Sequence, residues 1–190
     1  MSFIDILLLS LRDIRITSHY KAVSNKLRLF KSLFSPSFIC ISLYRISHLF
    51  YLLKIPLMPK MFWWINFLLF KIDIDYRSKI YAGMYMPHPI LIAIGEGVKI
   101  FGFLKIMQGV TIGGNLNRNR IFEGKVIMQL FIKENVFLGI GVIIAGLVKI
   151  KGIIFGAANS LITKDIIGKA LYSNGLIKSL EGEYLLEIYK

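Results

Sequence analysis

Residues 73–114 read DIDYRSKIYAGMYMPHPILIAIGEGVKIFGFLKIMQGVTIGG, and a large aliphatic side chain returns at every sixth position of this stretch. The positions are Ile74, Ile80, Met86, Ile94, Ile100, Ile106 and Ile112. One step of eight residues, from Met86 to Ile94, interrupts the run, and His88 lies inside it. A helix repeats every 3.6 residues and a strand every 2, so six residues hold one short strand and a corner. The period therefore predicts a parallel β-helix, whose coils bury their apolar side by stacking on one another.

Glycines between the aliphatic positions support this prediction, because tight corners need small residues. They are Gly83, Gly95, Gly97, Gly102, Gly109, Gly113 and Gly114. An isoleucine-rich chain can show such a period by chance, but seven matches in two phased runs argue against chance.

The period resumes further along the chain. The matching positions are Val126, Ile132, Leu138, Ile144, Ile150 and Ile162. Gly156 stands where a large residue is expected, so one coil is imperfect or slips by a residue next to Phe155. Residues 115–125, NLNRNRIFEGK, are polar and basic and are expected to form a loop that leaves the prism.

The first 70 residues lack the six-residue period, and we expect helices there. The expected helices span residues 3–15, 22–34 and 37–53, with Pro36 placed to begin the third. Arg45 and His48, three residues apart, share one face of that third helix.

A further apolar segment, MFWWINFLLF at residues 61–70, is too short to span a bilayer. Three alternatives remain open for it. It docks on the base of the β-helix, packs between subunits, or touches a membrane surface through Trp63 and Trp64.

The fold class expected from these patterns is mainly β, a parallel β-helix with an α-helical N-terminal region and a short C-terminal cap. We place the helical region at residues 1–71, the β-helix at 72–166 with its loop at 115–125, and a tail at 167–190. The last residues, LEGEYLLEIYK, resemble a short helix that would cover the open end of the last coil.

Composition narrows the partners. The 190 residues carry a formal net charge of +13 and are 55% hydrophobic. A basic surface favours a phosphate-bearing cofactor, an acidic polysaccharide precursor or an anionic membrane face. Nucleic acid is not expected, because no recognition motif appears and the basic residues do not cluster on one predicted helix.

The cellular location is inferred from the single cysteine and the start of the chain. Cys40 alone allows no intramolecular disulfide and no cysteine-based metal site, and no secretory signal is evident. We expect a cytoplasmic protein, with contact at the inner membrane face as a further expectation.

Five segments resemble the hexapeptide-repeat acetyltransferases with a left-handed β-helix, in particular the serine acetyltransferase-like branch. They are DID at residues 73–75, His-Pro at 88–89, QGVTIGG at 108–114, ENVFLGIGV at 134–142 and GAANSLITKDI at 156–166. The resemblance covers roughly residues 35–166. It implies transfer of an acetyl group from acetyl-CoA, as co-substrate and without a metal, to a hydroxyl group.

By this resemblance His88 is the general base, and Asp73 matches the aspartate that orients it. An imidazole suits the role because its pKa lies near neutrality. The two residues are 15 apart, close to one coil of about 18, so they are expected to lie on neighbouring turns. Two alternatives remain open. Asp75 is the other candidate for the orienting acid, and a structural role for His88, as a corner residue bonded to the backbone, is the alternative to catalysis. Cys40 lies outside the repeat, and no covalent enzyme intermediate is needed.

The resemblance also implies a cofactor groove between subunits of a homotrimer or a dimer of trimers. The matching cofactor-binding positions are Gly113, Gly114, Gly139, Ile140, Gly141 and Ala158, with Lys164 placed to meet a phosphate. Each glycine alone can equally be a simple turn.

Three departures from serine acetyltransferases bear on the acceptor. Pro87 replaces the aspartate that helps to hold the amino acid, and Met128 and Gln129 replace an arginine and a histidine. We therefore predict a sugar hydroxyl of a capsule, O-antigen or other polysaccharide precursor as the acceptor, with Pro87, Arg120 and Gln129 near it. Arg118 belongs to the same basic loop. Serine O-acetyltransferase is the alternative, and a non-catalytic β-helix scaffold is a further one.

Overall fold

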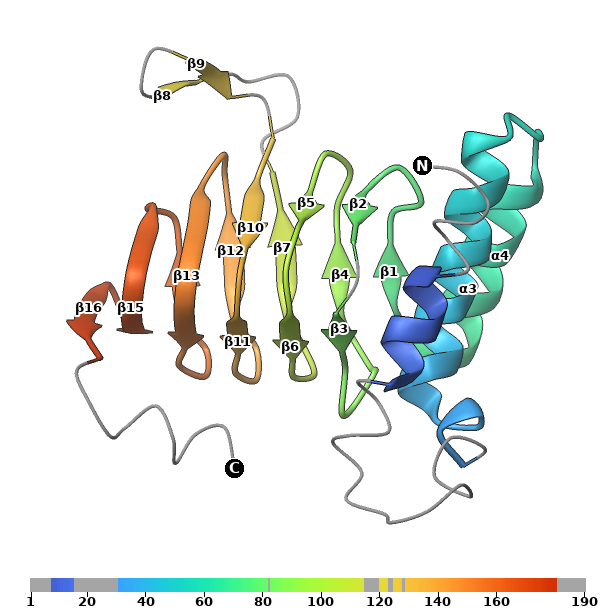
Figure 1. Cartoon of the computed structure of the whole chain (residues 1–190), viewed down its shortest axis with the longest axis horizontal. Coiled ribbons are helices and arrows are strands. Elements are labelled where there is room, and N and C mark those ends of the chain that lie inside the picture. Colours follow the sequence, from blue (N-terminus) through green and yellow to red (C-terminus); the bar gives the residue numbers. More distant parts are fainter. Residues whose placement is uncertain are drawn as a thin grey trace.

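The computed structural model describes residues 8–15, 31–81, 83–114, 120–122, 125–127 and 129–180. Residues 8–15 are helical, and α3 (Pro36–Leu52) and α4 (Met58–Phe70) follow. A row of parallel strands then extends away from these helices (Figure 1). The expected helical N-terminal region and mainly parallel β architecture are confirmed for these residues.

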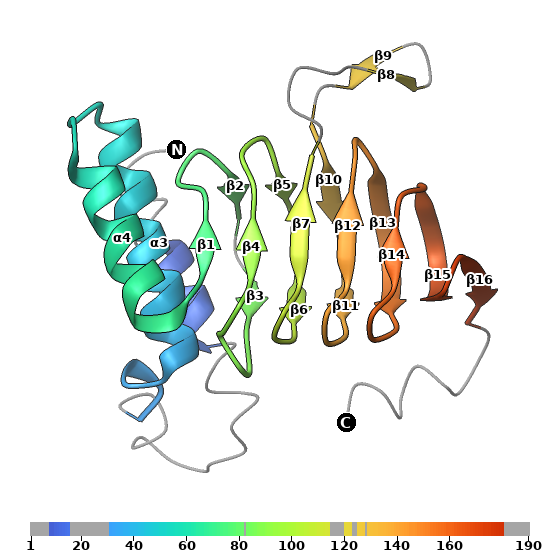
Figure 2. The ribbon, with the colours of Figure 1, turned by 180° about the vertical axis from the view of Figure 1, so that it is seen from behind.

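The strands form the three faces of a left-handed β-helix. Face 1 contains β1 (Asp73–Ile74), β4 (Ala93–Ile94), β7 (Thr111–Gly113), β12 (Ile143–Ala145) and β14 (Leu161–Ile162), side by side in Figure 2. Face 2 contains β2 (Lys79–Ile80), β5 (Lys99–Ile100), β10 (Phe131–Lys133) and the first half of β13 (Lys149–Gly156). Face 3 contains β3 (Met84–Tyr85), β6 (Leu104–Ile106), β11 (Val136–Leu138) and the second half of β13. β13 turns the corner between faces 2 and 3 at Gly152, whose φ of 125° favours glycine.

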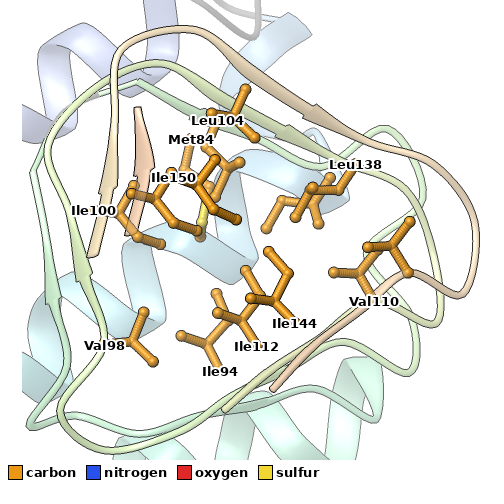
Figure 3. Close-up of a cluster of buried hydrophobic side chains, with 14 of the residues drawn as sticks. Met84, Ile94, Val98, Ile100, Leu104, Val110, Ile112, Leu138, Ile144 and Ile150 are labelled. Atoms are coloured by element: carbon orange, nitrogen blue, oxygen red, sulfur yellow. The ribbon is translucent and has the colours of Figure 1, made fainter. Parts of the chain in front are cut away.

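The side chains that recur every six residues point into the interior of this prism. Aliphatic side chains from all three faces meet along its axis (Figure 3). The sequence predicted one inward row, and the structure adds a second row two residues before the positions of the first. The second row includes Ile72, Met84, Ile92, Val98, Leu104, Val110, Leu130, Val136, Val142, Val148 and Ile154, all buried. It was missed because valine, methionine and serine vary at these positions, whereas isoleucine dominates the first row.

Gly156 does not shift the register. It pairs with Leu138, and the next inward residue, Ile162, pairs with Ile144. Of the two alternatives, the coil is therefore imperfect and does not slip. The space that a side chain would fill is bordered by Leu138, Val142 and Ile162.

The prediction for Val126 is wrong. It lies in β9 (Lys125–Ile127), which pairs antiparallel with β8 (Arg120–Phe122) in a hairpin that projects from the prism (Figure 1). The excursion therefore extends past residue 125, and the inward pattern resumes at Leu130. A single apolar residue of a hairpin strand can fall on the six-residue spacing by chance, because apolar and polar residues also alternate along such a strand.

The two ends of the prism are covered differently. At the first coil, the Tyr44 hydroxyl of α3 donates to the Ser78 carbonyl, and Arg45 donates to the carbonyls of Ile80 and Tyr81. At the last coil, β15 (Ile166–Ser173) pairs in parallel along β13, and β16 (Leu176–Ser179) folds back on it antiparallel. The parallel stacking thus continues beyond residue 166, where the sequence placed its end. The helix expected at residues 180–190 lies outside the described residues, apart from Leu180.

Helix α4 packs on α3 and on the first strand. The Ser47 hydroxyl donates to the Pro59 carbonyl, and the Asn66 amide donates to the Cys40 carbonyl. The helix begins at Met58, before the predicted start, because Pro59 is tolerated in a first turn. Its other face exposes Met61, Trp64, Leu68 and Leu69. None of the described helices combines the length and the apolar character needed to cross a bilayer.

Candidate active site

His88 lies at the corner between face 3 and face 1, after β3 and before β4. Its side chain is exposed, and its backbone carbonyl accepts a hydrogen bond of 2.9 Å from the Ile90 amide. Two extra residues enlarge this corner, since Asp73 pairs with Ala93, 20 residues later, whereas Ala93 pairs with Thr111 after 18. The insertion places the imidazole outside the regular coil, where a ligand can reach it.

Asp73 does not hydrogen-bond to His88 in this structure. Its Oδ1 accepts a hydrogen bond of 2.8 Å from Trp63 Nε1 of α4. Since the longer coil places Ala93 opposite Asp73, a separation of 15 residues falls short of one turn here. The alternative acid, Asp75, is bound by the backbone amide and guanidinium of Arg77. Orientation of His88 by Asp73 therefore stays a prediction.

The His88 corner continues along the prism as a ladder of backbone hydrogen bonds. The Gly109 amide donates to the Ile90 carbonyl at 3.2 Å, and the Gly141 amide donates to the Gln108 carbonyl at 3.0 Å. One coil further on, the Asn159 amide donates to the Ile140 carbonyl at 2.7 Å. The Oε1 atom of Gln108 is buried and has no hydrogen-bond partner among the described residues. This corner thus combines an exposed base with a buried, unsatisfied acceptor that could receive a ligand donor.

An apolar groove of about 400 Å³ opens beside the same corner, on face 3. Its lining is Met107, Phe137, Gly139, Ile140, Phe155, Gly156, Ala157, Ala158 and Leu171. A Cβ on Gly139 would come within 2.9 Å of the Ala158 backbone nitrogen, so the two coils approach closely only because this residue is glycine. Three predicted cofactor-binding residues, Gly139, Ile140 and Ala158, are therefore brought together. The groove's size and apolar lining fit the extended arm of a cofactor such as acetyl-CoA.

Lys105 is a cation near this groove that the sequence analysis missed. Its Nζ lies 5.4 Å from the centre of the Phe137 ring, and burial lowers its pKa. It follows Leu104 directly, so the alternation of inward and outward residues along a strand could have identified it.

The other predicted cofactor-binding residues are divided between two corners. Gly141 belongs to the His88 corner, where its φ of 65° matches the turn. Gly113 ends β7 and Gly114 follows it, and Lys164 follows β14, so these three lie at the opposite edge of face 1.

Of the predicted acceptor-binding residues, only Pro87 lies next to His88. Gln129 lies beside Gly97 at the corner that precedes face 2. Arg120 belongs to the projecting hairpin, and its side chain, like Arg118 and Met128, lies outside the described residues. Pro87 could be identified because it precedes His88 in the sequence. No local sequence pattern could show that Gln129 and Arg120 lie away from His88.

Two groups left out of the predicted chemistry have structural roles. His48 Nδ1 lies 2.6 Å from the Tyr76 carbonyl, and burial lowers the His48 pKa. Burial raises the pKa of the Cys40 thiol to about 12, so it cannot act as a nucleophile near neutrality. His19 lies outside the described residues. Within the described ranges, no cluster of three histidine, cysteine or acidic side chains is arranged to hold a metal ion.

Comparison with known proteins gives relatives of one kind. No family model matches the chain. It is 25% identical over 150 residues to the serine acetyltransferase of Synechococcus elongatus, an alignment covering 74% of this chain and 59% of the relative. It is 32% identical over 100 residues to the serine acetyltransferase of Buchnera aphidicola subsp. Schizaphis graminum, covering 51% and 35%. The chain thus spans less than two thirds of either relative.

Solved structures give the same picture of the fold. Neisseria gonorrhoeae serine acetyltransferase in complex with serine superposes with a TM-score of 0.75 at 21% identity, over 91% of this chain and 68% of the other. A serine acetyltransferase in complex with CoA superposes with a TM-score of 0.73 at 22% identity, over 94% and 70%. The fold is therefore the left-handed β-helix of the hexapeptide-repeat acetyltransferases, as the resemblance implied.

Proposed function

We propose that this protein is an acetyl-CoA-dependent O-acetyltransferase of the serine acetyltransferase type, with His88 as its general base. The observation that carries the proposal is the exposed imidazole at the corner whose ladder leads to the apolar groove of Gly139, Ile140 and Ala158. The described residues provide no such base elsewhere, since the only other described histidine, His48, is buried against Tyr76.

The chemistry needs one proton transfer at His88. Acetyl-CoA supplies the activated acetyl group as a thioester. A neutral ring nitrogen of His88 accepts the acceptor's hydroxyl proton as that oxygen forms its bond to the acetyl carbon. The carbon–sulfur bond then breaks, and the proton on His88 returns to the departing sulfur. Histidine thus ends the cycle neutral, and no other co-reactant is required.

The acceptor is the part of the proposal where comparison and sequence disagree. The relatives are named serine acetyltransferases, and one solved structure contains serine, which supports the alternative over the predicted sugar acceptor. Pro87, which carries no charge, stands beside His88 and favours an acceptor without an ammonium group. We therefore rank serine first and retain a sugar hydroxyl as the second candidate.

The decisive measurement is thiol release from acetyl-CoA with L-serine or with neutral sugars as acceptor. His88→Ala should lower kcat roughly 10²- to 10⁴-fold with whichever acceptor is used. Full activity in this variant would exclude His88 as the base. Lack of both acetyl-CoA binding and turnover in the wild type would instead favour the non-catalytic scaffold.

Pro87→Asp separates the two acceptors. With serine as the acceptor, the new carboxylate should lower KM for serine because it can pair with the ammonium group. If the protein's acceptor is a sugar, the same change should not make serine a substrate and should reduce turnover of the sugar.

We further propose a homotrimer or a dimer of trimers. The support is the division of the predicted cofactor-binding residues between two edges of face 1, which a rigid prism keeps apart but two neighbouring prisms can bring together. Analytical ultracentrifugation tests the assembly. A strictly monomeric, active protein would contradict it.

A further inference from the structure

Face 2 gathers lysines that are far apart in the sequence. Outward-pointing positions of four coils carry Lys79, Lys99, Lys133, Lys149 and Lys151. These residues come from β2, β5, β10 and β13, which lie side by side in the prism (Figure 1). The stacking thus creates a positively charged surface from lysines that are spread along the chain.

The strand register places like charges directly opposite each other. Lys79 is paired with Lys99, and Lys133 with Lys151. Like charges at opposed positions of neighbouring strands destabilise a sheet. Neighbouring strands are about 4.8 Å apart, so anionic groups spaced along a polymer could each approach more than one of these lysines.

An aromatic strip crosses the same face between the lysines. The Tyr81 and Phe101 rings are stacked with centroids 4.5 Å apart, and Phe101 and Phe131 are 4.8 Å apart. Phe101 retains 38% of its surface exposed. Lys79 and Lys99 lie on one side of the strip, and Lys133, Lys149 and Lys151 lie on the other.

Acidic groups near this face leave most of its charge uncompensated. Asp75 and Glu96 both pair with Arg77, outside the lysine rows. Asp165 accepts a hydrogen bond from the Lys149 backbone amide, and Glu134 is exposed at the turn after Lys133. Among the described residues, no carboxylate forms an ion pair with Lys79, Lys99, Lys133 or Lys151.

We propose that face 2 is a binding surface for an acidic polysaccharide. The aromatic strip provides apolar contacts for the flat sides of sugar rings, and lysines on both sides of it meet carboxylate or phosphate substituents. Face 2 lies opposite the His88 corner in the triangular section, so this surface is separate from the catalytic site.

The side-chain types favour a glycan over nucleic acid. The described strands of face 2 carry lysines and no arginine, whereas arginine provides the bidentate geometry typical of nucleic-acid recognition.

The test is direct binding of the full chain to polygalacturonate, with neutral dextran as the uncharged comparison. We expect binding to polygalacturonate that weakens with added salt, and none to dextran. Lys99→Glu combined with Lys151→Glu should weaken it about tenfold or more. Phe101→Leu, which keeps bulk but removes the ring, should weaken it about threefold.

The matched control is Lys54→Glu combined with Lys60→Glu, which makes the same charge change at two exposed positions, Lys54 in the turn after α3 and Lys60 in the first turn of α4. It should bind like the wild type. Equal loss in both double variants would overturn the proposal, because only net charge would then matter. Absence of binding by the wild type would also overturn it, as would tighter binding to oligodeoxythymidine or to phosphatidylglycerol vesicles. Unchanged thiol release with a small acceptor in the Lys99/Lys151 variant would confirm that its fold and catalytic site are intact.

Discussion

The prism interior and the helical cap are stabilised in opposite ways. Inside the prism, aliphatic residues repeat from coil to coil, and each contacts others of its own kind. Where α3 covers the first coil, the buried residues include Arg45, Asp13, Tyr44 and His48. A repetitive apolar core spreads its stabilisation over many similar contacts, whereas a polar cap depends on a few hydrogen-bonded groups that cannot replace one another.

The strongest test of this difference is Arg45→Ala. Its Nε and Nη2 atoms each lie 3.0 Å from Asp13 Oδ2, and the guanidinium also serves the carbonyls of Ile80 and Tyr81. Removing it leaves the buried Asp13 carboxylate without its cationic partner and removes the guanidinium donors to the two carbonyls. We expect the free energy of unfolding to fall by about 3 to 5 kcal/mol, measured by urea denaturation.

The matched control for Arg45→Ala is the double change Arg45→Met with Asp13→Leu, which removes both charges together. It should recover much of the loss, because two apolar side chains leave no buried charge behind. A loss below about 1 kcal/mol in the single variant would show that water or another group compensates.

A smaller effect is expected inside the prism from Ile112→Val. Ile112 is fully buried between Ile94 and Ile144, and losing one methylene costs about 0.5 to 1.5 kcal/mol. The same change at Ile144 should give a similar value, since the two sites are equivalent in the repeat. Values differing several-fold would contradict the idea of interchangeable coils.

The cap should also make stability depend on pH. Burial lowers the pKa of His48 in the folded protein, and nearby Arg45 and Lys79 lower it further, against the opposing hydrogen bond to Tyr76. The unfolded chain then binds the proton more readily, so His48 lowers stability as pH falls below its unfolded value of about 6.5. His48→Asn keeps a donor for the Tyr76 carbonyl but does not titrate. The denaturation midpoint of this variant should therefore fall less between pH 7.5 and pH 5.5 than that of the wild type.

The smallest expected effect is at the imperfect coil, in Gly156→Ala. A new Cβ would meet Leu138 Cδ2 at 3.3 Å, Val142 Cγ2 at 3.4 Å and Ile162 Cδ1 at 3.6 Å. These are flexible side-chain ends, and the substitution also reduces the entropy of the unfolded chain. We expect a change within about 1 kcal/mol, with stabilisation if the three side chains adjust. A loss of 3 kcal/mol would show that this part of the prism is already fully packed.

The sequence predicted much of the prism and part of the site. Periodic isoleucines specified the inward row, and the eight-residue step identified the enlarged corner of His88. Orientation of His88 by Asp73 stays a prediction, since the enlarged corner places Ala93 opposite Asp73. Trp63 of α4, ten residues before Asp73 in the chain, binds its carboxylate, and no periodicity in the helical region predicts that bond.

The sequence by itself determined the period, and hence the coils, since a side chain that must point inward once per corner has to recur every six residues. Only the tertiary structure decided which coils pair after insertions of different length. That register brings Gly139 and Ala158 into one groove and places Lys133 opposite Lys151. The physical reason is that a repeat constrains the inside of every coil alike, whereas outward neighbours depend on the number of residues each corner inserts.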